Sequence, residues 1–305
     1  MKVKNINPYL VDAKDILINK KSNPISRVPK MNFGNMPLDG GHLLLSDQEK
    51  KDFLLKEPNA KKFIKPLISA HEFLNGQLRW CLWLVNAEPN ELKQMPEVLK
   101  RVALVKKFRL DSVAPSTQKF ALTPSLFRDR NQPNTFIVIP RVSSENRSYI
   151  PIGFFNKNSI VSDTCMAIPN ANLFNFGVLT SAMHMAWVKY VCGRLKSDYR
   201  YSKDIVYNNY PWPQNPTDKH NRSVEMAAQK ILDVRAMFPN TCLADLYNPL
   251  TMPRELAKAH QVLDKVVDTC YRSQPFTSDA QRMEYLFILY EQYTTDLFSA
   301  TNTTI

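Results

Sequence analysis

Glycine is scarce in this sequence, and the scarcity restricts what the chain can fold into. Only 7 of the 305 residues are glycine, against 21 prolines. Dinucleotide-binding and P-loop folds need glycine where the backbone approaches phosphate, so the composition argues against both. The chain is 44% hydrophobic, which is enough for real cores, and its length suits two domains. The sequence therefore indicates a globular chain rather than a disordered, collagen-like or coiled-coil one.

The cysteines and the apolar runs bear on the compartment of the protein. The five cysteines are odd in number and widely spaced, without a CxxC pair, so we expect reduced, mostly buried thiols rather than disulfides or a zinc site. The sequence has no run of 18 apolar residues, and its first residues lack the apolar segment of a signal peptide. We therefore predict no membrane span and a cytoplasmic location.

The positive charge is concentrated in the middle of the chain. The formal net charge is +12, and residues 101–222 alone contribute +10, with 17 basic and 7 acidic side chains. Residues 1–100 contribute +5 and residues 223–305 contribute −3. A localised basic segment is typical of a nucleic-acid-binding surface. An incidental basic bias is the alternative, because net charge by itself reports non-specific attraction.

Proline punctuation and hydrophobic periodicity predict three regions in an α+β chain. Residues 1–45 read as an irregular segment that wraps over a folded body. Residues 46–213 read as a domain with a mixed or antiparallel sheet and helices, and the proline-rich stretch 211–216 marks its end. Residues 214–305 read as a small C-terminal helical domain. The individual predictions are helices at 47–56, 59–69, 96–110, 178–192, 217–239, 253–272 and 278–297, and strands at 79–85, 135–139, 148–155 and 160–168.

Two of these helices carry specific end signals. Ser46 followed by Glu49 has the spacing of a capping box, which predicts the start of the first helix. Gly193 follows the apolar run 178–192, and we expect it to end that helix as a left-handed C-terminal cap.

Catalytic motifs are absent from the sequence. The five histidines show neither an HExxH motif nor another metal spacing, and no GxSxG elbow occurs. Asn7-Pro8-Tyr9 is similar to the Asn-Pro-Pro-Tyr loop that holds a flipped adenine in amino-methyltransferases, but it lacks the second proline. We interpret it as an ordinary turn, and we expect the chain not to be catalytic alone.

Residues 194–213 are the most informative segment, because charged, amide and hydroxyl-bearing aromatic side chains are crowded there. Arginine or lysine suits the major-groove acceptors of guanine, and aspartate accepts from the amino group of cytosine. Lys196 and Asp198 are placed to read one base pair together if the backbone between them is extended. Arg194, Arg200 and Lys203 suit phosphates. The alternative is a solvated surface turn whose tyrosines, Tyr199, Tyr201 and Tyr207, pack at the domain boundary.

This segment resembles the target-recognition region of MmeI-like type IIL restriction–modification enzymes. Those enzymes are single chains that join an endonuclease, an N6-adenine methyltransferase and a DNA-reading domain. The resemblance covers nearly the whole chain. Its motifs are Ile6-Asn-Pro-Tyr-Leu-Val-Asp12, Met36-Pro-Leu-Asp-Gly-Gly41, Val142-Ser-Ser-Glu-Asn-Arg147, Tyr149-Ile-Pro-Ile-Gly153, Ile168-Pro-Asn-Ala171, Phe176–Trp187, Gly193-Arg-Leu-Lys-Ser-Asp-Tyr-Arg-Tyr-Ser202, Val206-Tyr-Asn-Asn-Tyr-Pro-Trp-Pro213, Leu243–Pro253 and Lys258–Asp264.

The resemblance implies that the chain is the C-terminal part of such an enzyme, either cut out of it or encoded as a remnant. The partners it implies are double-stranded DNA and a linked or associated methyltransferase domain. S-adenosylmethionine and Mg²⁺ would serve the missing domains, and we expect no cofactor or metal in this chain. Base reading is implied at three places, which are the Glu145/Arg147 turn, the Asn170 to Asn172 turn and the Lys196/Asp198 pair. To the phosphate contacts named above we add Lys106, Lys107 and Arg109, from the basic surface of the 96–110 helix.

Two further hypotheses belong to other classes of protein. In the first hypothesis, the chain is a stand-alone methyltransferase that acts through Asn7-Pro8-Tyr9. In the second, it is an interaction module whose helical domain docks a protein partner through Tyr290 and Tyr293. For those two tyrosines the simpler alternative is packing against the rest of the chain. A stand-alone DNA-binding remnant without a methyltransferase partner also stays open.

Overall fold

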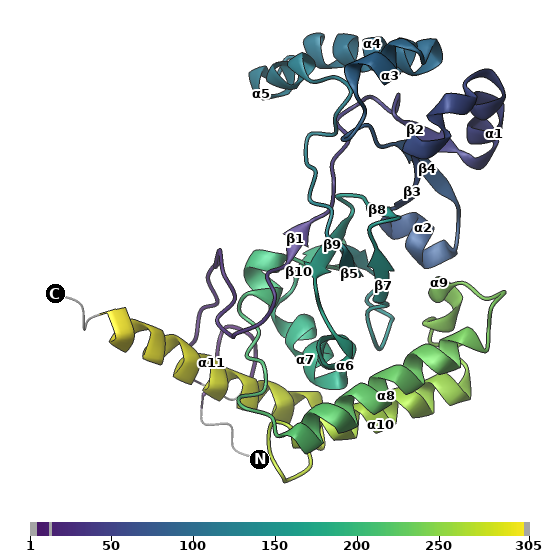
Figure 1. Ribbon diagram of the computed structural model, residues 1–305. Coiled ribbons are helices and arrows are strands. Elements are labelled where there is room, and N and C mark those ends of the chain that lie inside the picture. The colour runs from purple at the N-terminus through teal and green to yellow at the C-terminus, as the bar shows by residue number, and fades with distance from the viewer. Residues whose placement is uncertain (1–4, 12–13, 302–305) are drawn as a thin grey trace. The chain divides into compact units, whose positions relative to one another are not determined.

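The computed structural model describes residues 5–11 and 14–301, and these form two compact units (Figure 1). Unit 1 contains the described residues up to Met31, then Ile139–Gly153, and then the described residues from Ile168. Unit 2 contains Asn32–Val138 and Phe154–Ala167. Residues 1–4, 12, 13 and 302–305, which belong to the predicted 1–45 and 214–305 regions, lie outside the described residues. Helices and mostly antiparallel strands in these units confirm the α+β class.

Unit 2 is built on two four-stranded sheets, with strand orders β2-β4-β3-β8 and β1-β9-β5-β7. All strand pairs with a described register here are antiparallel except β3 with β8. The larger of its cores contains Leu43, Phe63, Leu82 and Val105. The elements are β1 Asn32–Phe33, β2 Leu44–Ser46, α1 Asp47–Lys56, η1 Pro58–Phe63, β3 Ile64–Ile68, α2 Ala70–Asn75, β4 Arg79–Leu82, α3 Pro89–Lys93, α4 Pro96–Leu110, α5 Pro115–Gln118, η2 Lys119–Leu122, β5 Thr135–Pro140, β7 Gly153–Asn156, β8 Ile160–Val161 and β9 Cys165–Pro169, of which β5, β7 and β9 each run into unit 1 at one end.

The first helix of unit 2 confirms its sequence signal, and the second predicted helix is wrong. Ser46 accepts from the Glu49 amide and the Glu49 carboxylate accepts from the Ser46 amide, so the predicted capping box starts α1. The predicted helix at 59–69 is instead the short 3₁₀ helix η1 followed by strand β3. Pro66 explains the difference, since proline in a helix interior lacks the donor for one hydrogen bond and clashes with the preceding turn.

Unit 1 combines a small three-stranded sheet, β10-β11-β6, with a set of packed helices. Helix α8 packs against both α10 and α6, and α11 packs against α7. Figure 1 shows α8 and α10 side by side along most of their length. The three predicted C-terminal helices are confirmed as α8, α10 and α11. The elements are β6 Val142–Ser143, α6 Leu173–Leu179, α7 Ala182–Val191, β10 Gly193–Leu195, β11 Asp198–Arg200, η3 Lys203–Tyr207, α8 Asp218–Ala236, α9 Leu243–Leu246, α10 Arg254–Thr269 and α11 Asp279–Thr301.

Gly177 permits the close approach of α6 to α8 and α10. A Cβ atom at this position would lie 2.6 Å from Val224 Cγ1 and 3.3 Å from Leu263 Cδ1. Carbon atoms at optimal separation are about 3.5–4.0 Å apart, so any larger residue would force the helices to shift. This glycine is therefore used for packing, not for contact with phosphate.

The predicted helix 178–192 is wrong in its start and in its predicted cap, while its end at Val191 lies within one residue of the prediction. The structure has two helices here, because Ser181 begins a new one by accepting from the His184 amide. Gly193 does not cap the second helix, since it has no positive φ and is the first residue of strand β10. The chain therefore passes directly from α7 into the β10–β11 hairpin.

The tyrosine face of α11 is packed inside unit 1. The Tyr290 hydroxyl donates to Asn209 Oδ1 at 3.2 Å, and the Tyr293 hydroxyl donates to the Trp212 carbonyl at 2.8 Å. Phe287, on the same face, is 1% exposed. This is the simpler of the two alternatives for that face, and it removes the argument for a protein-docking surface there.

Asn7-Pro8-Tyr9 forms an ordinary turn, as the sequence predicts. The side-chain oxygen of Asn7 accepts from the amides of Tyr9 and Val11 at 3.0 and 3.1 Å. Asn7 is 1% exposed, so its carboxamide is used in local structure. Among the described residues, no helix is both long and apolar enough to cross a membrane.

Candidate nucleic-acid interface

The three-stranded sheet of unit 1 brings two distant polar segments together. Tyr199 of β11 pairs with Ser143 of β6, and Arg200 pairs with Val142. On its other edge β11 pairs with β10 across a two-residue turn, with Leu195 opposite Asp198. The turn that follows β6 is thereby placed beside the β10–β11 hairpin. Two of the three predicted base-reading places thus lie at one site.

Direct contacts join these two segments. The Glu145 amide donates to Asp198 Oδ1 at 3.3 Å, and Arg194 Nη1 lies 3.8 Å from Glu145 Oε2. The Arg194 side chain is 38% exposed and that of Glu145 is 45% exposed, so the ion pair is open to solvent and of small energetic value. These contacts show that the two turns lie against each other, with their charged side chains at the surface.

Arg147 is the partly buried member of the group. Its Nη1 donates to Ser143 Oγ at a long 3.5 Å. Burial lowers the pKa of Arg147, and the negative charge of Asp198 acts in the opposite direction. A half-buried guanidinium beside a carboxylate has few rotamers, so its donors are presented in a defined direction.

Arg194 supports the hairpin from within. Its Nη1 donates to the Ser197 carbonyl at 2.9 Å, and its guanidinium lies over the Tyr199 ring, 4.1 Å from the ring centre. Part of its donor capacity is therefore used to hold the turn. Binding of a phosphate by Arg194 stays a prediction.

Lys196 and Asp198 are not joined by an extended backbone, contrary to the condition stated from the sequence. Lys196 is in the turn with a φ of 55°, a left-handed conformation that non-glycine residues adopt infrequently. The two side chains therefore project from a tight hairpin end, not from one face of a strand. Lys196 is exposed and Asp198 is partly exposed.

The tyrosines of this segment behave as the alternative interpretation expects. Tyr199, Tyr201 and Tyr207 are all at most 4% exposed, and the Tyr201 hydroxyl is 3.0 Å from His184 Nε2. His184 is 1% exposed, and burial lowers its pKa to about 3. Neutral His184 is thus a core residue that pairs with a tyrosine.

Asn170 and Asn172 lie elsewhere, in the turn between β9 and α6. Asn170 has a φ of 54°, and Asn172 is the N-cap of α6, where its side-chain oxygen accepts from the Asn175 amide at 2.9 Å. Both residues are exposed. The structure does not join this turn to the Glu145 and Lys196 segments by any described side-chain contact.

The predicted phosphate contacts are divided between the two units. Arg200 is exposed on β11, and Lys203 is close to Asp204, with 2.7 Å between Nζ and Oδ1. Lys106 and Lys107 are exposed on α4 of unit 2. The +10 of residues 101–222 is split accordingly, with +5 in each unit.

The prediction that Arg109 binds phosphate is wrong. The side chain is 0% exposed, and its nitrogens donate to five backbone carbonyls at 2.7–3.0 Å. The error arose because the sequence shows that the helix carries basic residues but does not show that loops cover Arg109. The carbonyls belong to Pro37, Leu38, Phe120, Thr123 and Leu126.

Sequence reasoning missed the residues that support the Glu145–Arg147 turn. Tyr149 donates to Asp264 and stacks on His260, both of α10. His260, Asp264 and Asp268 follow one another at four-residue spacing on α10, whose other buried residues are apolar. Polar residues at helical spacing on a packed face were the available signal.

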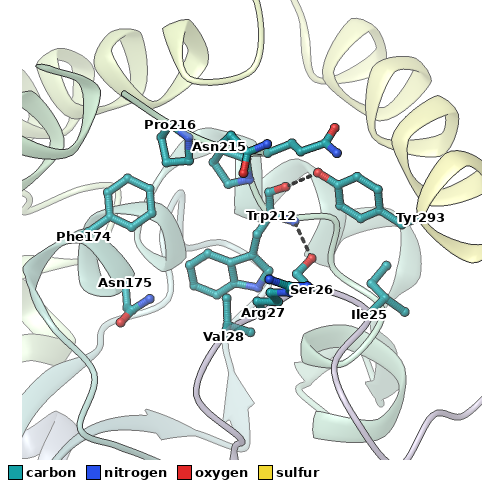
Figure 2. A pocket seen from close by; sticks show the side chains of 12 residues that line it. Ile25, Ser26, Arg27, Val28, Phe174, Asn175, Trp212, Asn215, Pro216 and Tyr293 are labelled. Atoms are coloured by element: carbon teal, nitrogen blue, oxygen red, sulfur yellow. Dashed lines mark hydrogen bonds between the residues drawn. The ribbon is translucent and has the colours of Figure 1, made fainter. Parts of the chain in front are cut away.

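A pocket in unit 1 lies away from these residues. It has a volume of about 640 Å³, and Figure 2 shows Trp212 at its centre between Phe174 and Tyr293. Two hydrogen bonds, drawn in Figure 2, hold the backbone of Trp212: its amide donates to Ser26 Oγ, and its carbonyl accepts from the Tyr293 hydroxyl. None of the predicted base or phosphate residues lines it. Within the described part of the chain, no three His, Cys, Asp or Glu side chains are grouped to hold a metal ion.

The small sheet of unit 1 presents charged side chains of both signs at its turns, which is a class of surface suited to binding the polar groups of a ligand. Family models agree with this class. The model described as the MmeI target recognition domain matches residues 12–214, and the model described as the MmeI C-terminal domain matches residues 216–298. The chain therefore belongs to the MmeI target recognition domain family, which confirms the resemblance drawn from the sequence.

Two relatives match nearly the whole chain. DNA methyltransferase A of Bacillus subtilis (strain 168) is 45% identical over 293 residues, which are 96% of this chain and 33% of that protein. The type IIL restriction-modification enzyme MmeI, solved in complex with DNA, is also 45% identical, with a TM-score of 0.92 over 97% of this chain and 39% of that one. The type IIG restriction endonuclease BpuSI matches with 13% identity and a TM-score of 0.43. The chain spans about a third of the length of the curated relative that it matches.

Proposed function

We propose that this chain recognises a specific sequence in double-stranded DNA, as the target-recognition part of a restriction–modification enzyme. The observation that carries the proposal is the joined pair of turns in unit 1, where the β10–β11 hairpin and the turn after β6 present Glu145, Arg147, Lys196 and Asp198 together. A relative with 45% identity, MmeI, has been solved with DNA. That relationship supports duplex DNA as the ligand.

The side chains suit the major groove, where each base pair presents a distinct set of donors and acceptors. Arg147 and Lys196 supply donors for guanine, while Glu145 and Asp198 accept from the amino group of cytosine. Opposite charges held next to each other suit a G·C pair, whose two bases need opposite partners. We propose that Asn170 and Asn172 add a third contact with bases from their separate turn.

Phosphate contacts position the duplex but carry no direct sequence information. We assign them to Arg194, Arg200 and Lys203 of unit 1 and to Lys106 and Lys107 of unit 2. Arg109 is excluded from this set because its side chain is buried.

The catalytic steps belong to other parts of the parent enzyme in this proposal. N6-adenine methylation with S-adenosylmethionine, and Mg²⁺-dependent cleavage, would be carried out by a linked or associated methyltransferase and nuclease inside the cell. A stand-alone DNA-binding remnant is the second candidate, but no observation favours it over the family relationship.

The proposal is tested by selecting bound duplexes from a randomised pool with the 305-residue chain and with Lys196→Ala and Asp198→Ala variants. We expect the wild-type chain to enrich a defined sequence. Each variant is expected to lose preference at one base pair, by roughly 1–3 kcal/mol, and to keep it elsewhere.

Lys219→Ala is the matched control, because Lys219 is an exposed lysine of unit 1 outside the proposed interface. We expect it to leave the selected sequence unchanged. A wild-type chain that enriches no sequence would contradict the proposed function. Enrichment of one unchanged sequence by both variants would contradict only the assignment of these two residues.

A further inference from the structure

A partly buried carboxylate on α10, that of Asp264, contacts two of the three chain segments that carry or lead to the proposed base-reading residues. Asp264 Oδ2 accepts from the Tyr149 hydroxyl at 2.6 Å, and Asp264 Oδ1 accepts from the Ala182 amide at 2.7 Å. Tyr149 follows Glu145 and Arg147 in the same loop. Ala182 is the first residue of α7, which runs directly into the β10–β11 hairpin.

The geometry of both bonds is that of strong contacts. A distance of 2.6 Å between a hydroxyl and a carboxylate oxygen is in the range of charge-assisted hydrogen bonds, which are about twice as strong as neutral ones. The Ala182 amide belongs to the first turn of a helix, where the amides lack partners within the helix and the dipole favours a negative charge. Asp264 thus satisfies two groups that would otherwise be left without a partner.

The same loop has a second attachment to the C-terminal helices. The Tyr149 ring stacks on His260, with 3.9 Å between ring centres and an angle of 20°. Arg235 of α8 donates to the Ile152 carbonyl at 2.7 Å and to the Tyr247 hydroxyl at 2.8 Å, and that hydroxyl lies 2.9 Å from His260 Nε2. Side chains from α8 and α10 therefore hold the loop just after the reading turn, and Tyr247, the residue that follows α9, links Arg235 to His260.

We propose that Asp264, with Tyr149, is a positioning residue for sequence recognition, through which the C-terminal helices set the relative placement of the Glu145/Arg147 turn and the Lys196/Asp198 hairpin. This inference rests on the proposed function. Neither residue contacts DNA in it. Loss of the Asp264 contacts would loosen the spacing of the two turns, and discrimination between bases depends on that spacing because hydrogen bonds are sensitive to angle and distance.

The test uses the 305-residue chain with Tyr149→Phe and Asp264→Asn. Tyr149→Phe removes one hydroxyl and keeps the ring on His260. Asp264→Asn keeps an acceptor for the Ala182 amide but offers an NH₂ group, not an acceptor, to the Tyr149 hydroxyl. Base preference is measured by selection from a randomised duplex pool, and affinity for the selected duplex is measured over a salt series.

We expect each variant to lose roughly tenfold of its discrimination at the base pairs read by the two turns. The slope of affinity against salt concentration is expected to stay as in the wild type, since the phosphate contacts are unchanged. Tyr285→Phe is the matched control, because its partly buried hydroxyl also donates at 2.6 Å, to the Tyr271 carbonyl, without touching either segment. It is expected to lower thermal stability by a similar amount and to keep full discrimination.

Wild-type discrimination in both folded variants would overturn the positioning role. An equal loss in Tyr285→Phe would also overturn it, because general destabilisation would then explain the effect. Failure of the wild-type chain to select any sequence is a different result, which refutes the proposed function and the positioning role with it.

Discussion

Arg109 illustrates how one side chain organises several loops at the residue scale. Its planar guanidinium donates to carbonyls of residues 37, 38, 120, 123 and 126, and burial lowers its pKa. A guanidinium has five donors in a fixed fork, whereas an ammonium has three on one atom. Arginine at this position therefore connects the segment before β2 with the segment after α4.

We predict that Arg109→Lys destabilises unit 2 without changing contacts with DNA. Lysine leaves at least two buried carbonyls without a donor, and each costs about 1–3 kcal/mol, so a loss of roughly 2–6 kcal/mol is expected. Urea unfolding measures this free energy. The control Arg130→Lys makes the same change at an exposed side chain and is expected to stay within about 0.5 kcal/mol of the wild type. Equal stability of the two variants would contradict the structural role of Arg109.

The candidate site could be predicted from the sequence only in part, and the reason is visible in single residues. Lys196, Asp198 and the Glu145/Arg147 turn were found from residue type and from the family resemblance. Their mutual contact was not, because β6 and β11 are more than 50 residues apart and pair only in the folded chain. Arg109 shows the reverse case. The helix was predicted correctly, but the role assigned to Arg109 was wrong, because its burial depends on distant loops.

At the scale of the elements, predictions succeeded where the local sequence decides the structure. The capping box of α1 and the amphipathic C-terminal helices are local signals, and both are confirmed. Short segments were wrong where tertiary contacts decide. Residues 64–68 became a strand because β4 and β8 pair with them, in addition to the effect of Pro66 on a helix. The 178–192 run divided at Ser181, where the following amide, that of Ala182, donates to Asp264 of α10.

Helix α10 provides a pH-dependent contribution to the stability of unit 1. The pKa of Asp264 is raised to about 6, chiefly because burial disfavours the charged form, while the Tyr149 and Ala182 hydrogen bonds oppose the rise. Asp268 raises the pKa further, and Arg282 lowers it. Since the pKa in the folded protein exceeds the ordinary value of 3.8, protonated Asp264 favours folding. This contribution is fully present below about pH 4 and is lost as the pH rises through about 6.

We predict that Asp264→Asn removes this pH dependence. A rise of about two units in pKa corresponds to roughly 3 kcal/mol, so the stability of the variant relative to the wild type should increase by up to that amount between pH 4 and pH 7. Urea unfolding of both proteins at several pH values gives the difference. Asp233→Asn, which changes an exposed carboxylate of α8, serves as the control with a constant difference. A constant difference for Asp264→Asn would show that the carboxylate titrates in the same way in the folded and unfolded chain.

At the scale of the whole molecule, the charge pattern of the sequence and the fold do not coincide. Residues 101–222 carry +10 and looked like one basic surface, yet the chain crosses between the two units within this stretch, and each unit receives half. The phosphates of a duplex attract basic side chains from any part of a protein that reaches them. It follows that unit 2 could contribute phosphate contacts of its own. The exposed lysines on α4 of unit 2 allow this contribution to be measured.

We predict that Lys106→Gln combined with Lys107→Gln weakens DNA binding equally for all sequences. Each phosphate contact that is lost should reduce the slope of log affinity against log salt by about 1, so the double variant should lose about 2. Base preference should not change, because these lysines contact only the backbone of the duplex.

The control is Lys61→Gln with Lys93→Gln, two exposed lysines of the same unit with the same total change of charge. An equal loss of slope in both double variants would mean that the net charge of unit 2, not contacts from α4, attracts the DNA. An unchanged slope in both would confine phosphate binding to unit 1, where Arg194, Arg200 and Lys203 would then account for all of it.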